Sequence, residues 1–161
     1  MKGSFTNFGS VAGGAVLAVI LLAALLAPIV GPHEPDARFE GILNAPPTAV
    51  HLAGAGGRLR SPFIYPWIRV NQLEQRYEPD RTAEIPLSWF ASGHLVQSAD
   101  EARAPLLLLG SDSFGRDVFS RLLFGARISL SLSLAAALLA IGVGAMLGGI
   151  AGYVGGATDT I

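Results

Sequence analysis

Two long stretches of the chain contain no charged residue, and a polar region rich in proline separates them. The first stretch covers residues 11–30 and the second covers residues 128–153. An α-helix rises about 1.5 Å per residue, so each stretch is long enough to cross the roughly 30 Å hydrocarbon core of a bilayer. The pattern therefore predicts two transmembrane helices, at residues 11–31 and 127–154.

The first apolar stretch also has features of a secretory signal peptide, because Lys2 precedes it and the small residues Ala24 and Ala27 lie near its end. The apolar core of a signal peptide is about 7–15 residues long and leads to a small-residue cleavage site. This stretch is longer and lacks a clean Ala-x-Ala site, so a membrane helix that ends near Gly31 is favoured.

Small residues form a regular stripe along the second stretch. They recur every four positions, at Ala136, Ala140, Gly144, Gly148 and Gly152. Such a stripe lets another helix approach closely in lipid, where packing contacts drive helix association. We expect this face to pack against protein; the alternative is that glycine and alanine are simply common in membrane helices.

The region between the two stretches, residues 32–108, holds nine of the ten prolines and is expected to be an extracytoplasmic insert. Proline inside a helix removes a hydrogen bond and clashes with the preceding turn, so short strands are expected here. Residues 49–52 and 58–60 can pair as a hairpin around residues 53–57, and residues 62–70 and 85–90 have extended, aromatic patterns. The three histidines of this region lack metal-ligand spacing, which favours packing or surface roles for His33, His51 and His94.

Composition restricts the function. Hydrophobic residues make up 51% of the chain and charged residues 14%, which is typical of a membrane protein. The net charge of -1 provides no basic field for nucleic acid, and the absence of cysteine excludes disulfides and thiolate metal sites. No catalytic constellation is present, so we expect no enzyme activity, no cofactor and no metal site.

Residues 109–126 are expected to form a separate amphipathic helix that lies along the membrane interface and turns at Gly125 into the second span. Ser111 or Asp112 could cap it, and Phe114 and Val118 would belong to its apolar face. The predicted fold class is therefore a mainly α membrane protein with two transmembrane helices, a proline-rich insert with short strands, and an interfacial helix.

The particular residues of this segment carry a family resemblance. The runs Leu-Gly-Ser-Asp (109–112), Gly-Arg-Asp-Val (115–118), Ser-Arg-Leu (120–122) and Gly-Ala-Arg-Ile-Ser-Leu (125–130) resemble the signature of C-type oligopeptide/dipeptide ABC-transporter permeases. Residues 151–156, with Asp159 beyond them, are similar to the turn that follows the second membrane helix of that family.

The resemblance implies a permease subunit in the bacterial inner (plasma) membrane, as part of an ATP-driven peptide importer. Its partners would be a second homologous permease, two ATP-binding subunits that hydrolyse ATP, an extracytoplasmic solute-binding protein and the lipid bilayer. Family members continue through further helices and a cytoplasmic coupling loop, so this chain is expected to be an N-terminal fragment that does not transport alone. The alternatives are a small two-span scaffold with an extracytoplasmic partner-binding domain, and a secreted domain cleaved near Ala27.

Lys2 favours a cytoplasmic N-terminal tail at residues 1–10 and a cytoplasmic turn at residues 155–161. Arginines before the second span oppose this orientation, but long loops are translocated largely regardless of charge. The motif residues expected to have structural roles are Gly115, Arg116, Asp117, Arg121 and Arg127. Arg116 and Asp117 could form an ion pair or interfacial anchor near the outer gate, or a solvated pair of little energetic value.

Overall fold

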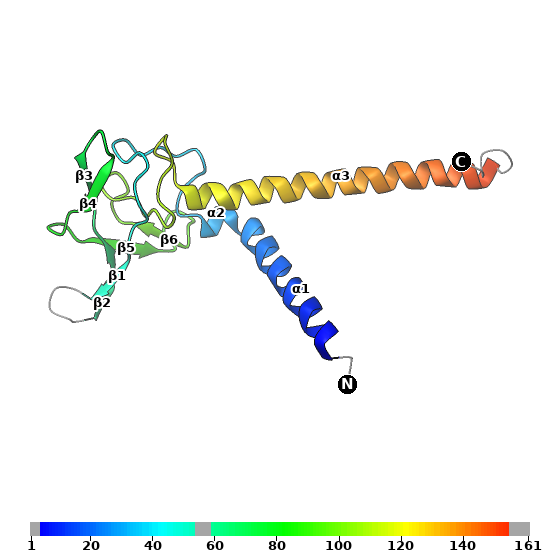
Figure 1. Cartoon of the computed structure of the whole chain (residues 1–161), viewed down its shortest axis with the longest axis horizontal. Coiled ribbons are helices and arrows are strands. Elements are labelled where there is room, and N and C mark those ends of the chain that lie inside the picture. Colours follow the sequence, from blue (N-terminus) through cyan, green and yellow to red (C-terminus); the bar gives the residue numbers. More distant parts are fainter. Residues whose placement is uncertain (1–3, 54–58, 155–161) are drawn as a thin grey trace.

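The computed structural model describes residues 4–53 and 59–154, and Figure 1 shows two long helices that leave a strand-rich region in different directions. We call that region, which carries all the strands between His51 and Ser98, the strand module. The elements in chain order are α1 (Ser4–Leu25), α2 (Ala27–Val30), β1 (His51–Ala53), β2 (Leu59–Ile64), β3 (Trp67–Asn71), β4 (Arg76–Pro79), β5 (Ile85–Trp89), β6 (Val96–Ser98) and α3 (Val118–Val154).

The strand module contains a four-stranded antiparallel sheet in the order β1-β2-β5-β6 and a separate hairpin of β3 and β4. The predicted pairing around residues 53–57 is confirmed as the β1–β2 hairpin, where His51 is opposite Phe63 and Ala53 is opposite Leu59. Residues 54–58 of the expected turn lie outside the described residues. The described part of the chain is thus a mixed helix and strand fold, which corrects the mainly α prediction.

A small apolar core stabilises the sheet. Its buried members are Ile64, Leu87, Ala104 and Leu106. Ala104 and Leu106 come from an irregular segment before the second span, and Leu106 is only 1% exposed. Burying one large aliphatic side chain contributes about 1.5–3 kcal/mol, so this segment secures the strand module to the chain that leads into α3.

The first apolar stretch forms two helices and not the single one expected at residues 11–31. The main helix, α1, begins earlier, at Ser4, and ends at Leu25. Pro28 lies in the first turn of α2, the position where the missing amide of proline is tolerated. A continuous helix would need that amide, which explains why the chain bends before Ala27.

The second correction concerns residues 109–126. The structure has no separate helix over this range: residues 109–117 form turns and one isolated bridge, and α3 begins only at Val118. The helix continues through Gly125 without a turn. Glycine is disfavoured inside helices by only about 1 kcal/mol, and the helix-forming residues on both sides offset that cost.

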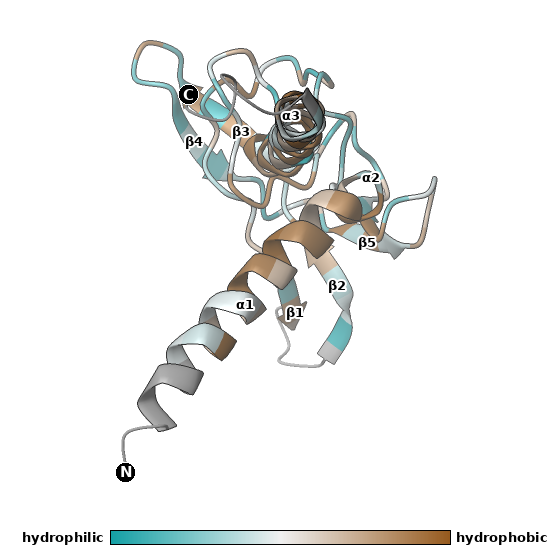
Figure 2. Cartoon of the chain, turned by 90° about the vertical axis from the view of Figure 1, so that its right-hand side faces the viewer, coloured by the Kyte–Doolittle hydropathy of each residue, from teal (hydrophilic) through white to brown (hydrophobic). Residues whose placement is uncertain are grey.

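Both long helices expose apolar side chains, and the brown ribbon in Figure 2 marks the apolar residues of the C-terminal half of α1. In α3, Leu138 is 61% and Ile141 67% exposed. Among the described residues, α3 is the single helix long and apolar enough to cross a bilayer, over Val118–Tyr153. The apolar part of α1, Gly9–Leu25, is shorter, so a membrane span at residues 11–31 remains a prediction.

Candidate functional site at the helix junction

Three buried polar residues meet where the two long helices come together. His33 follows α2, whereas Asp117 and Ser120 lie at the start of α3, and their exposed fractions are 3%, 1% and 0%. The Nδ1 atom of His33 lies 3.3 Å from Oδ2 of Asp117, and the backbone amide of His33 donates a hydrogen bond to Oγ of Ser120 (3.1 Å). We call this cluster the helix junction.

Asp117 is the N-cap of α3. Its Oδ1 accepts a hydrogen bond from the amide of Phe119 (3.1 Å), and its Oδ2 accepts one from the amide of Ser120 (3.1 Å). The first amides of a helix have no partner within the helix, and a carboxylate satisfies them and also interacts favourably with the helix dipole. The hydroxyl of Ser120 donates a further bond to the same Oδ2 (2.6 Å). A buried negative charge is thus compensated by four donors when His33 carries its proton on Nδ1.

Close packing at Gly31 completes the junction. A Cβ atom at this position would meet the carbonyl oxygen of Ala27 at 3.0 Å and Oγ of Ser120 at 3.2 Å, so a larger residue would require these neighbours to shift. The carbonyl of Gly31 lies 2.6 Å from Nδ1 of His94, and the amide of Leu95 donates to the carbonyl of Ile29 (2.6 Å). These bonds attach the strand module to the helix junction.

Residues 110–117, which we call the motif loop, fold around Asp112. Its carboxylate accepts hydrogen bonds from the amides of Phe114 (2.8 Å) and Arg116 (2.9 Å) and from Nε of Arg116 (2.9 Å). Nη1 of Arg121 also donates to it (2.6 Å). Burial alone would raise the pKa of Asp112, but the hydrogen bonds from Arg116 and Phe114 outweigh burial and lower the pKa from 3.8 to about 2.

The motif loop is held against residues 39–45 by backbone contacts that require glycine. Gly115 has a positive φ of 73°, and a Cβ atom there would lie 2.5 Å from the carbonyl oxygen of Phe39. Gly110 has a φ of 82°, and its Cβ would lie equally close to the carbonyl oxygen of Ala45. Ser111 joins the same two segments, since its Oγ accepts from the amide of Ala45 (2.8 Å) and its hydroxyl donates to the carbonyl of Ile42.

The structure separates the two residues that were expected to pair. Arg116 forms an ion pair with Asp112, with 2.8 Å between Nη2 and Oδ2, and its guanidinium lies over the ring of Phe114 at 4.6 Å. The carboxylate of Asp117 lies in the helix junction, where its partners are His33 and Ser120. The predicted Arg116–Asp117 pair is therefore wrong, because the amides of α3 and His33 compete for the carboxylate of Asp117 at closer range.

The other predicted residues are spread along α3. Arg121 shares the carboxylate of Asp112 with Arg116, whereas Arg127 is exposed about two turns further along the helix. The five residues of the small-residue stripe, Ala136, Ala140, Gly144, Gly148 and Gly152, are all exposed. A Cβ atom at any of its three glycines would meet nothing within 4 Å, so the stripe touches no other described segment and its packing role stays a prediction.

Sequence reasoning missed His33, Ser120, Gly31 and Asp112 as members of the site. The signal that could have found Ser120 is local: it lies three residues after Asp117, the spacing of an N-cap and its third helical residue, at the start of an apolar helix. His33 could not be found this way, because it lies 84 positions before Asp117.

The helix junction is a structural cluster and not a catalytic one. The hydroxyl of Ser120 donates to Asp117 and not to the imidazole, so His33 does not activate it as a base would activate a nucleophile. Among residues 4–53 and 59–154, no group of three or more histidines and acidic residues is arranged to hold a metal ion.

The known proteins that match this chain are membrane permeases of transport systems. Residues 5–47 match the family described as the N-terminal transmembrane domain of oligopeptide transport permease C. This match and the relatives below confirm the predicted resemblance, and the chain is similar to the N-terminal portion of oligopeptide/dipeptide ABC-transporter permeases.

Three relatives illustrate the similarity. The dipeptide transport system permease protein DppC of Haemophilus influenzae is 36% identical over 102 residues, which is 63% of this chain and 29% of the relative. The di/tripeptide transport system permease protein DppC of Pseudomonas aeruginosa is 28% identical over 147 residues, 91% of this chain and 32% of the relative. The nickel transport system permease protein NikC of Escherichia coli is 47% identical over 51 residues, 32% of this chain and 18% of the relative. The chain thus spans about a third or less of the length of these relatives, and no solved structure matches it.

Proposed function

We propose that this chain forms the N-terminal part of a permease subunit of an ATP-driven importer for peptides. One observation carries the proposal: the two segments with family resemblance fold onto each other. Residues 39–45, within the matched range 5–47, hold the motif loop through the amide of Phe39, which donates to the carbonyl of Gly115 (2.9 Å), and the amide of Asn44, which donates to the carbonyl of Asp112 (3.0 Å). The segment matched by the family and the motif loop therefore form one packed unit, which supports a common fold with the related permeases.

In the proposed orientation, both α1 and α3 cross the inner membrane, and the strand module lies on the extracytoplasmic side. The arrangement of the helices supports this proposal, because α1 ends and α3 begins at the helix junction and both run away from the strand module (Figure 1). The two chain ends would then share the cytoplasmic side. The run 128–153, about 39 Å as a helix, would occupy the bilayer, with Arg127 at the outer interface.

The role proposed for the helix junction is to fix the geometry between the two spans. Asp117, His33 and Ser120 are buried and bonded to one another, whereas the apolar faces of the helices are open. Arg116 and Arg121 neutralise Asp112 beside this cluster. The junction would therefore act as an anchor at the outer end of the spans.

The proposed partners follow from the same assignment. The small-residue stripe on α3 would contact further permease helices, and the strand module would face an extracytoplasmic solute-binding protein. Two ATP-binding subunits would hydrolyse ATP, so that the chain itself is a transport subunit without enzyme activity. The dipeptide and di/tripeptide relatives align over longer ranges than the nickel relative, which favours peptides as cargo over nickel.

Co-purification tests this assignment. A tagged full-length permease that contains this chain is expressed with the homologous permease and the two ATPase subunits, and the complex is isolated in mild detergent. We expect all partners to elute together. In the control, ATPase subunits from an unrelated importer should not elute with the permease. A permease that elutes without any ATPase would contradict the transport assignment and favour the two-span scaffold.

A further inference from the structure

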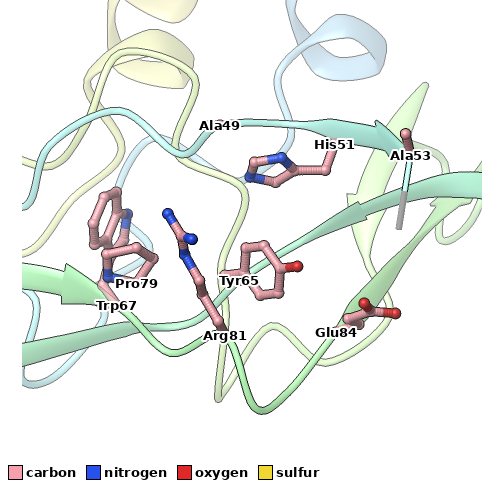
Figure 3. A pocket seen from close by; sticks show the side chains of 8 residues that line it. All are labelled: Ala49, His51, Ala53, Tyr65, Trp67, Pro79, Arg81 and Glu84. Atoms are coloured by element: carbon pink, nitrogen blue, oxygen red, sulfur yellow. The ribbon is translucent and has the colours of Figure 1, made fainter. Parts of the chain in front are cut away.

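A hollow lies in the strand module, apart from the helix junction. It has a volume of about 540 Å³, which falls in the range of small-molecule pockets, roughly 300–1,000 Å³. Figure 3 shows that strands and loops on several sides contribute to it. Its lining residues are Ala49, His51, Ala53, Tyr65, Trp67, Pro79, Arg81 and Glu84. The helix junction contributes none of these residues, so the pocket is a separate site.

One wall of the pocket is aromatic. The ring centroids of His51 and Tyr65 are 5.0 Å apart, and Phe63 packs behind them, with its ring 5.6 Å from His51 and 5.4 Å from Tyr65. These rings hold one another in place, so the wall is formed before any ligand arrives. Preformed apolar walls with a few polar groups are typical of ligand pockets.

Two of the polar groups that line the pocket are donors without an acceptor among the described residues. Arg81 points into the hollow between Trp67 and Tyr65, as Figure 3 shows. Within the described part of the chain, Arg81 has no ion pair or hydrogen bond, and the buried Nε1 atom of Trp67 has no hydrogen-bond partner. Arg81 is exposed, so a ligand that enters the hollow can reach its guanidinium directly.

The acidic residue of the pocket is already neutralised. Glu84 accepts a hydrogen bond from Nη1 of Arg60 (3.2 Å), so it does not compensate Arg81. The charge left over in the pocket is therefore positive. The matching ligand carries a carboxylate, which accepts from a guanidinium in a strong, charge-assisted geometry, next to an apolar group that can cover the rings.

We propose that this pocket binds the free carboxylate end of a short peptide. Arg81 donates to the carboxylate, and the last side chain of the peptide lies against His51 and Tyr65. The choice of a peptide among apolar carboxylates rests on the proposed function. The rest of the peptide leaves through the open side of the pocket, which places no limit on its length.

Fluorescence titration of the whole chain in detergent tests the proposal. The chain has two tryptophans, so Trp89→Phe leaves Trp67 as the only tryptophan reporter. The ligands are the dipeptide Ala-Phe, its C-terminal amide and 3-phenylpropanoate. We expect a saturable change in emission with Ala-Phe and at least about tenfold weaker binding of the amide, since a hydrogen bond to a charged group is lost.

Two matched variants locate the effect. Arg81→Gln is expected to weaken Ala-Phe binding at least about tenfold. Arg76→Gln leaves it unchanged, because this exposed arginine, paired with Glu78, lies at the turn end of the β3–β4 hairpin and does not line the pocket. Far-UV circular dichroism tests whether both variants are folded. If Arg81→Gln does not fold, the comparison of the acid and the amide on the parent chain decides.

The carboxylate site would be overturned by equal binding of the amide, by equal effects of the two variants, or by the absence of a saturable signal. Equal binding of 3-phenylpropanoate would overturn the assignment to peptides. The titration uses neither ATPase nor transport, so its outcome is independent of the co-purification result.

Discussion

His33 and Asp117 are 84 positions apart in the chain, and their side chains meet in the interior, with Nδ1 of the imidazole 3.3 Å from Oδ2 of the carboxylate. The Asp117 carboxylate also caps α3. One residue thus holds both the start of the long helix and the segment that follows the other helix.

Replacement of Asp117 separates its two roles. Asp117→Ala removes the cap and leaves His33 and Ser120 without their acceptor, so we expect a loss of about 2–4 kcal/mol in unfolding free energy. Asp117→Asn keeps the capping oxygen and is expected to cost about 1 kcal/mol. Thermal unfolding in detergent, followed by circular dichroism, measures both values. The exposed Asp36→Asn is the control and should change stability by less than about 0.5 kcal/mol; equal stability of all three variants would contradict the junction role.

Asp112 makes the stability of the motif loop depend on acid. Its pKa is lowered in the folded chain to about 2, so its contribution is fully present above the ordinary value of 3.8 and is lost as the pH falls through about 2. We expect stability to fall by on the order of 2 kcal/mol between about pH 4 and pH 2. Asp112→Asn should remove this part of the acid dependence. A variant with the same stability loss over that pH range as the parent would show that other carboxyl groups are responsible.

Two glycines near the start of α3 are expected to respond to alanine in opposite directions. Gly115→Ala places a side chain at a positive φ and against the carbonyl of Phe39, which should destabilise the chain by about 2 kcal/mol or more. Gly125→Ala lies inside the continuous α3 with open space around it and should stabilise the chain by about 0.5–1 kcal/mol. Chemical denaturation of the two variants measures the difference. Destabilisation by Gly125→Ala would favour the interrupted helix expected from the sequence.

The proposed orientation can be tested with cysteine labelling, because the chain contains no cysteine. Leu73, which is 97% exposed in the strand module, is replaced by cysteine in one variant, and Thr158, in the expected cytoplasmic turn, in another. In intact spheroplasts, a membrane-impermeant maleimide should label Leu73→Cys, whereas Thr158→Cys should react only after lysis. The reverse pattern would place the strand module in the cytoplasm.

The small-residue stripe predicts a packing face on α3. Ala140→Leu adds bulk on the stripe, and Ala135→Leu makes the same change on the opposite side of the helix; both positions are exposed in the isolated chain. We expect Ala140→Leu to reduce recovery of the homologous permease in co-purification several-fold, because a bulky residue prevents close approach of helices in lipid. Ala135→Leu should leave recovery unchanged. Equal recovery with both variants would mean that the stripe is not an interface.

Features that depend on local pattern could be predicted from the sequence. The apolar run after Arg127 forms the long α3, and the glycine-rich segment between residues 53 and 57 is flanked by a real hairpin, because periodicity and turn residues act over short distances. The family resemblance was also recognisable, since its residues are contiguous.

Features that depend on tertiary contacts could not be predicted. Arg116 has acidic residues both four positions before it and directly after it, and only the fold decides that Asp112 is its partner. The apolar segment with Ala104 and Leu106 has no strand or helix pattern of its own, yet it fills the core of the strand module. The role of His33 is equally invisible, because its partners come from the far end of the chain.

The unbroken length of α3 has a mechanical consequence. The helix has 37 residues and is about 56 Å long, which exceeds the roughly 30 Å thickness of the hydrocarbon core. In the proposed orientation, several turns at the Asp117 end would therefore project from the bilayer, or the whole helix would be tilted. Since α3 is continuous, those turns move together with the part of the helix in the bilayer. A change in the tilt of α3 would therefore displace the strand module at its N-terminal end.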